Sequence, residues 1–232
     1  MADRMPPAVA TFAKRVLLPV AVLLVAMIAL GLLITKVLEH AWPFTVEDGV
    51  NRALAGDRTS TGNAVTGFFS LLGSTPVIIA VTVLAAIVLR LKLHRWREPL
   101  MLCAAVSAQA IVFFFTTLAI DRARPDVRHL DESPPTSSFP SGHTSAAVAC
   151  YGGLALILAM LAHRTWVKAL CWALLLVPVA VALSRLYRGM HHPSDVAASL
   201  LNGALCITIM YWAILDRATN WSRTRLRRST AA

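Results

Sequence analysis

The sequence predicts an all-α, polytopic membrane protein with six transmembrane helices in one bundle and a short amphipathic helix on the outer face. Its 232 residues are 57% hydrophobic and 15% charged, with a mean hydropathy of +0.64. A soluble domain averages about 45–50% apolar and about 25% charged residues. Several uncharged runs also approach the ~20 residues that span a hydrocarbon core. This composition excludes a soluble enzyme, a disordered chain and a coiled coil.

The six predicted spans follow the uncharged apolar runs in chain order. They are 16–35, 76–90, 99–120, 143–163, 166–184 and 195–215. Before the second span, residues 73–76 (Gly-Ser-Thr-Pro) separate it from a shorter helix. The first run exceeds the 7–15 residues of a signal h-region and no small-residue cleavage site follows, which favours a retained helix over a signal peptide. With a basic tail at 216–232, residues 1–232 are expected to form a single membrane-embedded domain.

The distribution of charge predicts the orientation of these spans. Six spans place both termini on one side of the membrane. With cytoplasmic termini, the inner segments carry a net charge of +11 and the outer segments −1, out of a total of +10. Because cytoplasmic loops are enriched in Lys and Arg, we expect cytoplasmic termini and a periplasmic or extracellular active site. The basic excess is thus an orientation signal, and no nucleic-acid partner is expected.

Between the first two spans, apolar residues recur at helical spacing. Val46, Val50, Ala53 and Leu54 form one stripe. The intervening positions are polar: Glu47, Asp48, Asn51 and Arg52. This pattern predicts an amphipathic helix on the outer surface, and a solvated connector is the alternative.

Polar clusters gather at the outer ends of the last four spans, as span parity places them. They lie at 121–125, 140–143, 184–185 and 191–195. Ser141 is a natural N-cap, and the N–H groups that follow it form an anion site at the helix N-terminus. Gly142 lets a ligand approach the backbone closely, and Arg124 and Arg185 offer planar forks suited to phosphate oxygens.

The histidines of these clusters suggest covalent chemistry. His191 and Asp195 are four residues apart and share a face if the turn is helical. A carboxylate on one imidazole nitrogen leaves the other free as a nucleophile, and His143 supplies a second imidazole across the expected anion. The arrangement predicts phosphoryl transfer through a phosphohistidine, stabilised by protein cations, with no metal and no cofactor. A zinc site is disfavoured because adjacent histidines such as His191 and His192 are poor joint ligands.

These motifs resemble the type 2 phosphatidic acid phosphatase (PAP2) superfamily, whose pattern is Lys-x6-Arg-Pro, Pro-Ser-Gly-His and Ser-Arg-x5-His-x3-Asp. The second and third parts are complete here, at 140–143 and 184–195. The first part has its Arg-Pro at 124–125, but Thr117 stands at the lysine position. Three motifs in this order are a specific signal.

The resemblance implies roles for individual residues. His191 attacks phosphorus, Asp195 orients and charges it, and His143 protonates the leaving alkoxide. The phosphoryl oxygens are held by Arg124, Arg185 and the backbone of Ser141 and Gly142. Because Thr117 removes one phosphate-binding cation, Arg122 or Arg188 is expected to replace it, or else activity is weak or the substrate unusual.

The expected function is hydrolysis of a lipid phosphate or diphosphate at the outer membrane face. Polyprenyl diphosphate, phosphatidate and phosphatidylglycerol phosphate all fit. Three alternatives remain: a lipid phosphotransferase of the same family, a vanadium-dependent haloperoxidase-like enzyme, and a non-catalytic lipid binder or transporter. The expected partners are the lipid substrate and the surrounding membrane lipids, and no obligate protein partner is evident.

Overall fold

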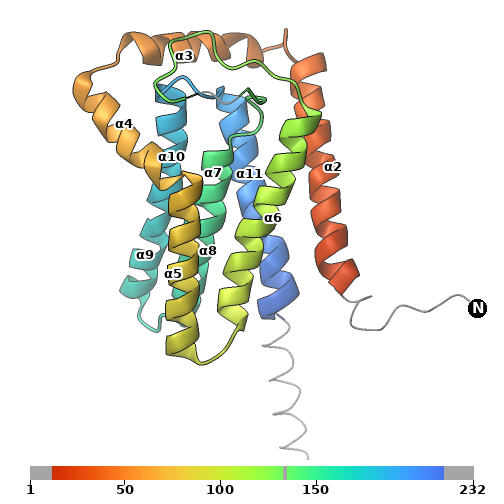
Figure 1. The fold of residues 1–232 in the computed structure, drawn as a ribbon, viewed down its shortest axis with the longest axis vertical. Helices are drawn as coiled ribbons and strands as arrows, with labels where there is room; N and C mark the ends of the chain where they lie inside the picture. Colours follow the sequence, from red (N-terminus) through yellow and green to blue (C-terminus); the bar gives the residue numbers. More distant parts are fainter. Residues whose placement is uncertain (1–11, 133–134, 217–232) are drawn as a thin grey trace, which may run out of the picture.

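The computed structural model describes residues 12–132 and 135–216, and all regular secondary structure in these residues is helical (Figure 1). Six helices are long and apolar enough to cross a membrane: Ala13–Val37, Thr75–Leu93, Arg97–Ala119, Gly142–Leu161, Thr165–Tyr187 and Pro193–Leu215. The predicted fold class is therefore confirmed. The basic tail predicted beyond Asp216 lies outside the described residues, and the single-domain assignment of 1–232 stays a prediction.

Most spans combine an α-helix with a short π or 3₁₀ segment. The α-helices are α2 (Leu18–Leu32), α3 (Glu47–Gly56), α4 (Ser60–Leu72), α5 (Thr75–Leu93), α6 (Arg97–Ala119), α7 (Gly142–Ala147), α8 (Gly153–Leu161), α9 (Thr165–Trp172), α10 (Leu176–Tyr187) and α11 (Pro193–Met210). The π segments are η1 (Ala13–Leu17), η2 (Leu33–Val37), η4 (Val148–Gly152) and η6 (Tyr211–Leu215). The 3₁₀ segments are η3 (Phe44–Val46) and η5 (Ala173–Leu175).

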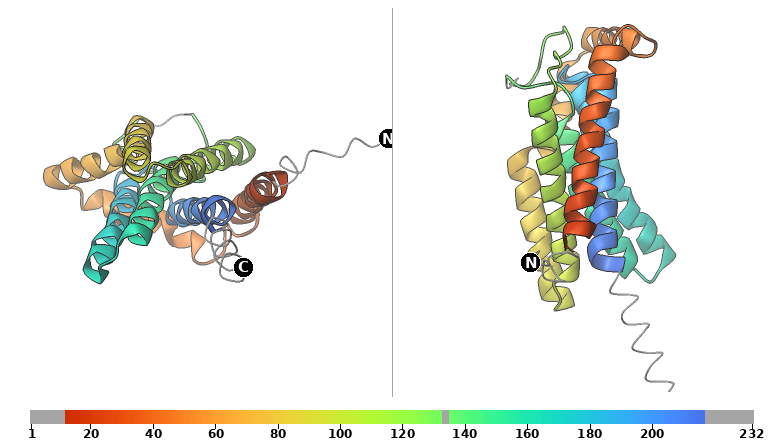
Figure 2. Two further views of the ribbon diagram at one scale, coloured as in Figure 1. Left: turned by 90° about the horizontal axis from the view of Figure 1, so that it is seen from below. Right: turned by 90° about the vertical axis from the view of Figure 1, so that its right-hand side faces the viewer.

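The fourth span, made of α7, η4 and α8, forms the centre of the bundle. In its most apolar 18-residue stretch, 72% of the residues are buried, against 17–39% in the other spans. Helices α5, α6, α10 and α11 contact it, while α2 packs outside against α6 and α11 (Figure 2). Small residues allow this close packing: a Cβ on Gly203 of α11 would lie 2.6 Å from Cβ of Val148. The N-terminus of α7 is consequently held at the middle of one end of the bundle.

Two short helices cover that end. Helix α4 begins at an N-cap, Thr59, whose hydroxyl accepts from the Gly62 N–H, and the chain bends between α4 and α5 where Gly73 and Ser74 precede Pro76. Helix α3 lies across the top of the bundle (Figure 1). The connection from α6 to α7 is non-helical in its described residues, 120–132 and 135–141, and these pass over the same end. The three elements place polar residues around the start of α7.

Candidate active site

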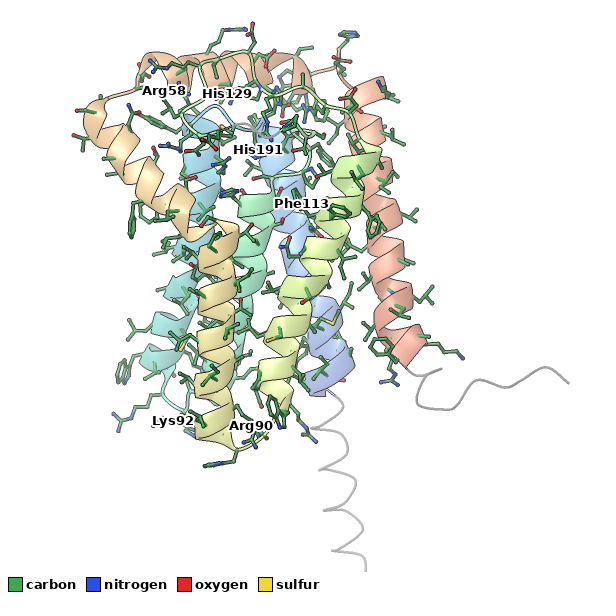
Figure 3. The ribbon with its side chains drawn as sticks, in the orientation of Figure 1. Arg58, Arg90, Lys92, Phe113, His129 and His191 are labelled. Atoms are coloured by element: carbon green, nitrogen blue, oxygen red, sulfur yellow. The ribbon has the colours of Figure 1, made fainter. Side chains whose placement is uncertain are left out.

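A cavity of about 780 Å³ lies in the half of the bundle that carries the start of α7. Its polar wall contains Arg124, Asp131, His143, Arg185, Arg188 and His191. Its apolar wall is formed by Ile78, Ile79, Val106, Phe113 and Phe114 of α5 and α6. Figure 3 shows His191 near the covered end and Phe113 below it on α6. The cavity thus has the polarity of an amphiphile, with a cationic end and an apolar body.

His191 lies in the turn between α10 and α11 and is buried. Its Nδ1 is 2.7 Å from the carbonyl oxygen of Ser138. A carbonyl oxygen can only accept, so Nδ1 carries the proton and Nε2 keeps its lone pair. The Asn51 amide, on α3, donates to the His191 carbonyl oxygen at 3.1 Å. Both the tautomer and the position of the imidazole are therefore fixed by neighbouring residues.

The pKa of His191 is lowered to about 3. Burial is the main cause, and the positive charges of Arg185 and Arg124 act in the same direction. Asp195 and the Ser138 hydrogen bond oppose the shift without overcoming it. The imidazole is neutral at physiological pH, which is the state that a nitrogen nucleophile requires.

Asp195 does not make the hydrogen bond to His191 that its spacing predicts. Its Oδ2 lies 4.0 Å from His191 Nδ1, close enough for charge attraction but beyond hydrogen-bond distance. Its carboxylate instead accepts from Arg122, from the Ser138 hydroxyl and, at 2.8 Å, from the His192 N–H. The reason is that His192 is the N-cap of α11 and Asp195 is its N3 residue, so the capping box directs the carboxylate back onto the helix start.

A support network behind Asp195 continues to α3. We define the support network as Glu47, Arg122, Ser138, His192 and Asp195. Glu47 accepts from Arg122 at 2.7 Å, and from the backbone N–H and hydroxyl of Ser194 at 2.7 and 2.9 Å. Ser138 connects the network to the imidazole, because its hydroxyl donates to Asp195 and its carbonyl accepts from His191.

The start of α7 contributes differently from the prediction. Ser141 caps the helix, but its own N–H donates to the Ser199 hydroxyl at 2.6 Å, so it is not available to a ligand. The first-turn N–H groups of Gly142 and His143 have no acceptor within the helix, and both residues line the cavity. Gly142 allows the Phe113 ring to pack closely there, since a Cβ would lie 2.8 Å from the ring and would displace it.

Two arginines of the cavity keep buried donors unpaired. Nη1 of Arg124 donates to the Met190 carbonyl at 2.7 Å, and Nη1 of Arg185 to the Ser70 hydroxyl at 2.7 Å. Nε of both arginines is buried and has no hydrogen-bond partner among the described residues. Burial also lowers the pKa of Arg124, against the attraction of Asp195. Leaving a buried donor unpaired is costly, so these two groups are suited to an anionic ligand.

The proposed replacements for the missing lysine lie in different places. Arg188 lines the cavity, where its guanidinium binds Asp131. Arg122 does not line this cavity, and the expectation that it supplies the missing cation is not supported, because Asp195 and Glu47 hold it in the support network. Thr117 lies on α6 one turn beyond Phe113, with its hydroxyl buried and unpaired among the described residues.

Four residues of this region were not predicted from the sequence to belong to the site: Glu47, Asn51, Asp131 and Ser138. Glu47 and Asn51 are buried, whereas Val46 and Val50 are exposed. Helix α3 therefore turns the side that carries Glu47 and Asn51 toward the bundle, while Asp48 and Arg52 stay exposed. The i, i+4 spacing of Glu47 and Asn51 was a usable signal, but a single sequence does not reveal which side of a surface helix faces the protein.

Comparison with known proteins adds a family relationship. Residues 98–218, just over half of the chain, match the PAP2 superfamily. The chain is 32% identical over 88 residues to the bacitracin transport permease protein BcrC of Bacillus licheniformis, a match that spans 38% of this chain and 39% of that relative.

Two solved structures have a similar fold. One is the transmembrane PAP2-type phosphatidylglycerolphosphate phosphatase of Bacillus subtilis, with a TM-score of 0.69 and 21% identity, over 83% of this chain and 94% of that one. The other is LpxE of Aquifex aeolicus, with a TM-score of 0.56 and 24% identity, over 73% of this chain and 97% of that one. At these identities the likeness concerns the fold.

Proposed function

Because the chain belongs to the PAP2 superfamily, we propose that it is an integral membrane lipid phosphatase that works through a phosphohistidine at His191. The observation that carries the proposal is that His191, Arg124 and Arg185 line the same cavity wall, and that Nε of both arginines has no hydrogen-bond partner among the described residues. The imidazole is neutral and holds its proton on Nδ1, so Nε2 is the free nucleophilic nitrogen.

In the proposed first step, Nε2 of His191 attacks phosphorus and the bond to the leaving oxygen breaks. His143, protonated at the start of the step, gives its proton to that oxygen and becomes neutral, so the lipid leaves as an alcohol, or as a monophosphate if the substrate is a diphosphate. Nε of Arg124 and of Arg185, with the Gly142 N–H, bind the phosphoryl oxygens. The imidazolium that forms is stabilised by Asp195, 4.0 Å away, and by the Ser138 carbonyl.

In the second step, a water molecule attacks the phosphohistidine and gives a proton to His143. The P–N bond breaks, inorganic phosphate leaves, and the neutral imidazole of His191 is restored. Protein cations carry the charge stabilisation in both steps, and we propose that no metal is needed. Residues 12–132 and 135–216 contain no group of three His, Cys, Asp or Glu residues placed to hold a metal ion.

The cavity supports a lipid as the substrate. The side chains of Leu71, Ile79 and Phe114 line the cavity and are also exposed on the side of the bundle. A lipid tail can therefore lie along α5 and α6 while its phosphate reaches the arginines. Phosphatidate, phosphatidylglycerol phosphate and polyprenyl diphosphate all have this form, and one solved relative is named for phosphatidylglycerolphosphate.

We also propose that the α3 end faces the periplasm or the cell exterior and that the termini are cytoplasmic, from the charge difference between the two faces. The test replaces the four native cysteines by serine and places one cysteine at Gly56 or at Lys92. In intact cells a membrane-impermeant maleimide should label Gly56→Cys alone. Labelling of Lys92→Cys before lysis would reverse the orientation.

The function is tested by phosphate release from a panel of these lipids in detergent, with and without EDTA, and with His191→Ala as the blank. We expect release from at least one lipid in the presence of EDTA, inhibition by vanadate, and none from His191→Ala. Full activity of His191→Ala would contradict the mechanism. Lipid binding by the wild type with no release from any lipid would indicate a non-catalytic binder.

A further inference from the structure

The cationic end of the cavity already contains an anion that belongs to the chain. Asp131, from the connection between α6 and α7, places its carboxylate between Arg185 and Arg188. Its Oδ1 accepts from Nε and Nη2 of Arg188 at 2.9 and 2.6 Å. Its Oδ2 accepts from Nη1 of Arg185 at 2.5 Å and from the Ser70 hydroxyl at 3.1 Å. A carboxylate and a phosphate bind the same guanidinium forks.

We propose that Asp131 is an internal competitor of the substrate phosphate: in the free protein it occupies Nη1 of Arg185 and Nε and Nη2 of Arg188, and it is displaced when phosphate on the free Nε of Arg185 also takes these donors. The inference rests on the proposed phosphate site. Asp131 then controls how tightly the site binds phosphate. It thereby sets the range of lipid concentration over which the enzyme is active.

The charges around the cavity explain why an internal anion is present. Arg124, Arg185 and Arg188 all line the cavity, and Arg185 is almost fully buried. Unpaired buried charges are strongly unfavourable. Burial opposes ionisation of Asp131, but hydrogen bonds from Arg188 and Ser70 and the charges of both arginines outweigh it and lower its pKa. The carboxylate is thus ionised at neutral pH and stabilises the empty site.

The arginines do not depend on Asp131 for their positions. Arg188 also donates to the carbonyl oxygens of Asn63 and Leu130 at 3.1 and 3.0 Å. Arg185 also donates to Ser70 at 2.7 Å and is carried by α10. Loss of Asp131 would leave these contacts in place, which argues against a purely positioning role.

Asp131 is also better placed to leave than either arginine. Its side chain is 27% exposed, against 4% for Arg185 and 10% for Arg188. It lies on a non-helical segment, so its carboxylate can turn toward solvent without unwinding a helix. An arriving phosphate can therefore exchange with it.

The test measures the Kd of inorganic phosphate and of orthovanadate for the purified full chain in detergent, by calorimetry. If the arginines are free in only a tenth of the molecules, the apparent Kd is raised about ten-fold. Asp131→Asn, which keeps the shape and one acceptor, is expected to lower Kd by about this factor or more. KM for any hydrolysed lipid should fall in parallel, with a smaller change in kcat.

Asp126→Asn is the matched control, because it removes the same charge from the same connection. Asp126 is exposed and does not line the cavity. The Kd of this variant for phosphate should change by less than about two-fold, as surface charges contribute little. An equal effect of both variants would show that any loss of negative charge near the cavity lowers Kd, and it would overturn the inference. An unchanged or raised Kd in Asp131→Asn would also overturn it.

A measurement on the unmutated protein covers the case in which Asp131→Asn fails to fold. The Leu130 N–H donates to the Arg188 carbonyl oxygen at 3.1 Å beside the ion pair. Saturating phosphate should increase deuterium uptake in residues 126–132 if Asp131 is released, and decreased uptake would contradict release. Tighter phosphate binding by Asp131→Asn without phosphate release from any lipid would keep this inference and remove the proposed phosphatase function.

Discussion

On the cavity side of His191, Arg124 and Arg185 keep buried Nε donors unpaired, whereas on the opposite side Asp195 accepts three hydrogen bonds. Unpaired buried donors destabilise the free protein and become useful only when an anion binds. A fully paired carboxylate fixes its neighbours and has little left to offer a ligand. The cavity side therefore supplies free donors for an anionic ligand, whereas the support network holds His191 in place.

The largest expected effect comes from the cavity side. Arg185→Ala removes a donor that the proposed mechanism aims at the phosphoryl oxygens, and loss of one such donor typically lowers kcat by about 10²–10³-fold. Steady-state phosphate release measures it, with Arg128→Ala, an exposed arginine of the α6–α7 connection, as the control. A loss of less than about ten-fold in Arg185→Ala would mean that Arg185 does not contact the transition state.

The two sides also act in opposite directions on the proton of His191. The folded pKa of about 3 lies below the ordinary value of 6.5, so the unfolded chain binds more protons between these values. Unfolding free energy should therefore fall as pH drops below 6.5, by up to about 1.4 kcal/mol per pH unit. Thermal unfolding in detergent at pH 7, 6 and 5 measures this, and His191→Asn should lose less stability over the same range. An equal loss in both proteins would show that other groups cause it.

A smaller effect is expected from the support network. Glu47→Gln weakens the ion pair with Arg122 without touching the cavity. We expect kcat to fall about ten-fold with little change in KM, because residues that orient a reacting group typically contribute on this scale. Asp57→Asn, at the exposed C-terminal end of the same helix, controls for the charge. A change confined to KM would place Glu47 in substrate binding.

The smallest expected effect is that of Thr117→Lys. The change restores the cation of the family pattern on the α6 face that carries Phe113. Since Arg188 already adds positive charge to the cavity, phosphatase activity should rise only a few-fold at subsaturating substrate. Lower activity would mean that the site depends on the threonine side chain at position 117. Thr117→Met, which adds a long side chain at the same position without a charge, is the matched control.

Local sequence patterns were sufficient for the fold class and for the residues of the three motifs. Apolar runs of span length predicted six helices, and span parity predicted that Arg124, His143, Arg185 and His191 meet at one end of the bundle, where all four line one cavity. These inferences need only helix length and charge, which each segment carries by itself.

The contacts that complete the site depend on tertiary packing and could not be read in the same way. The capping box of α11 redirects Asp195, so Ser138 bonds the imidazole in its place. Glu47 and Asp131 reach the site from segments that are distant in sequence and belong to no motif. Four-residue spacing predicts a shared helix face, but it does not decide which of two neighbouring histidines a carboxylate will contact.

The most direct test of the central claim is to identify the covalent intermediate. Rapid quenching of the enzyme with a ³²P-labelled lipid that it hydrolyses should trap a label that is stable in alkali and labile in acid, on the peptide containing His191. His191→Gln, shown to be folded by gel filtration and thermal unfolding, should carry no label and release no phosphate. A label on another residue, or full turnover by His191→Gln, would contradict the account.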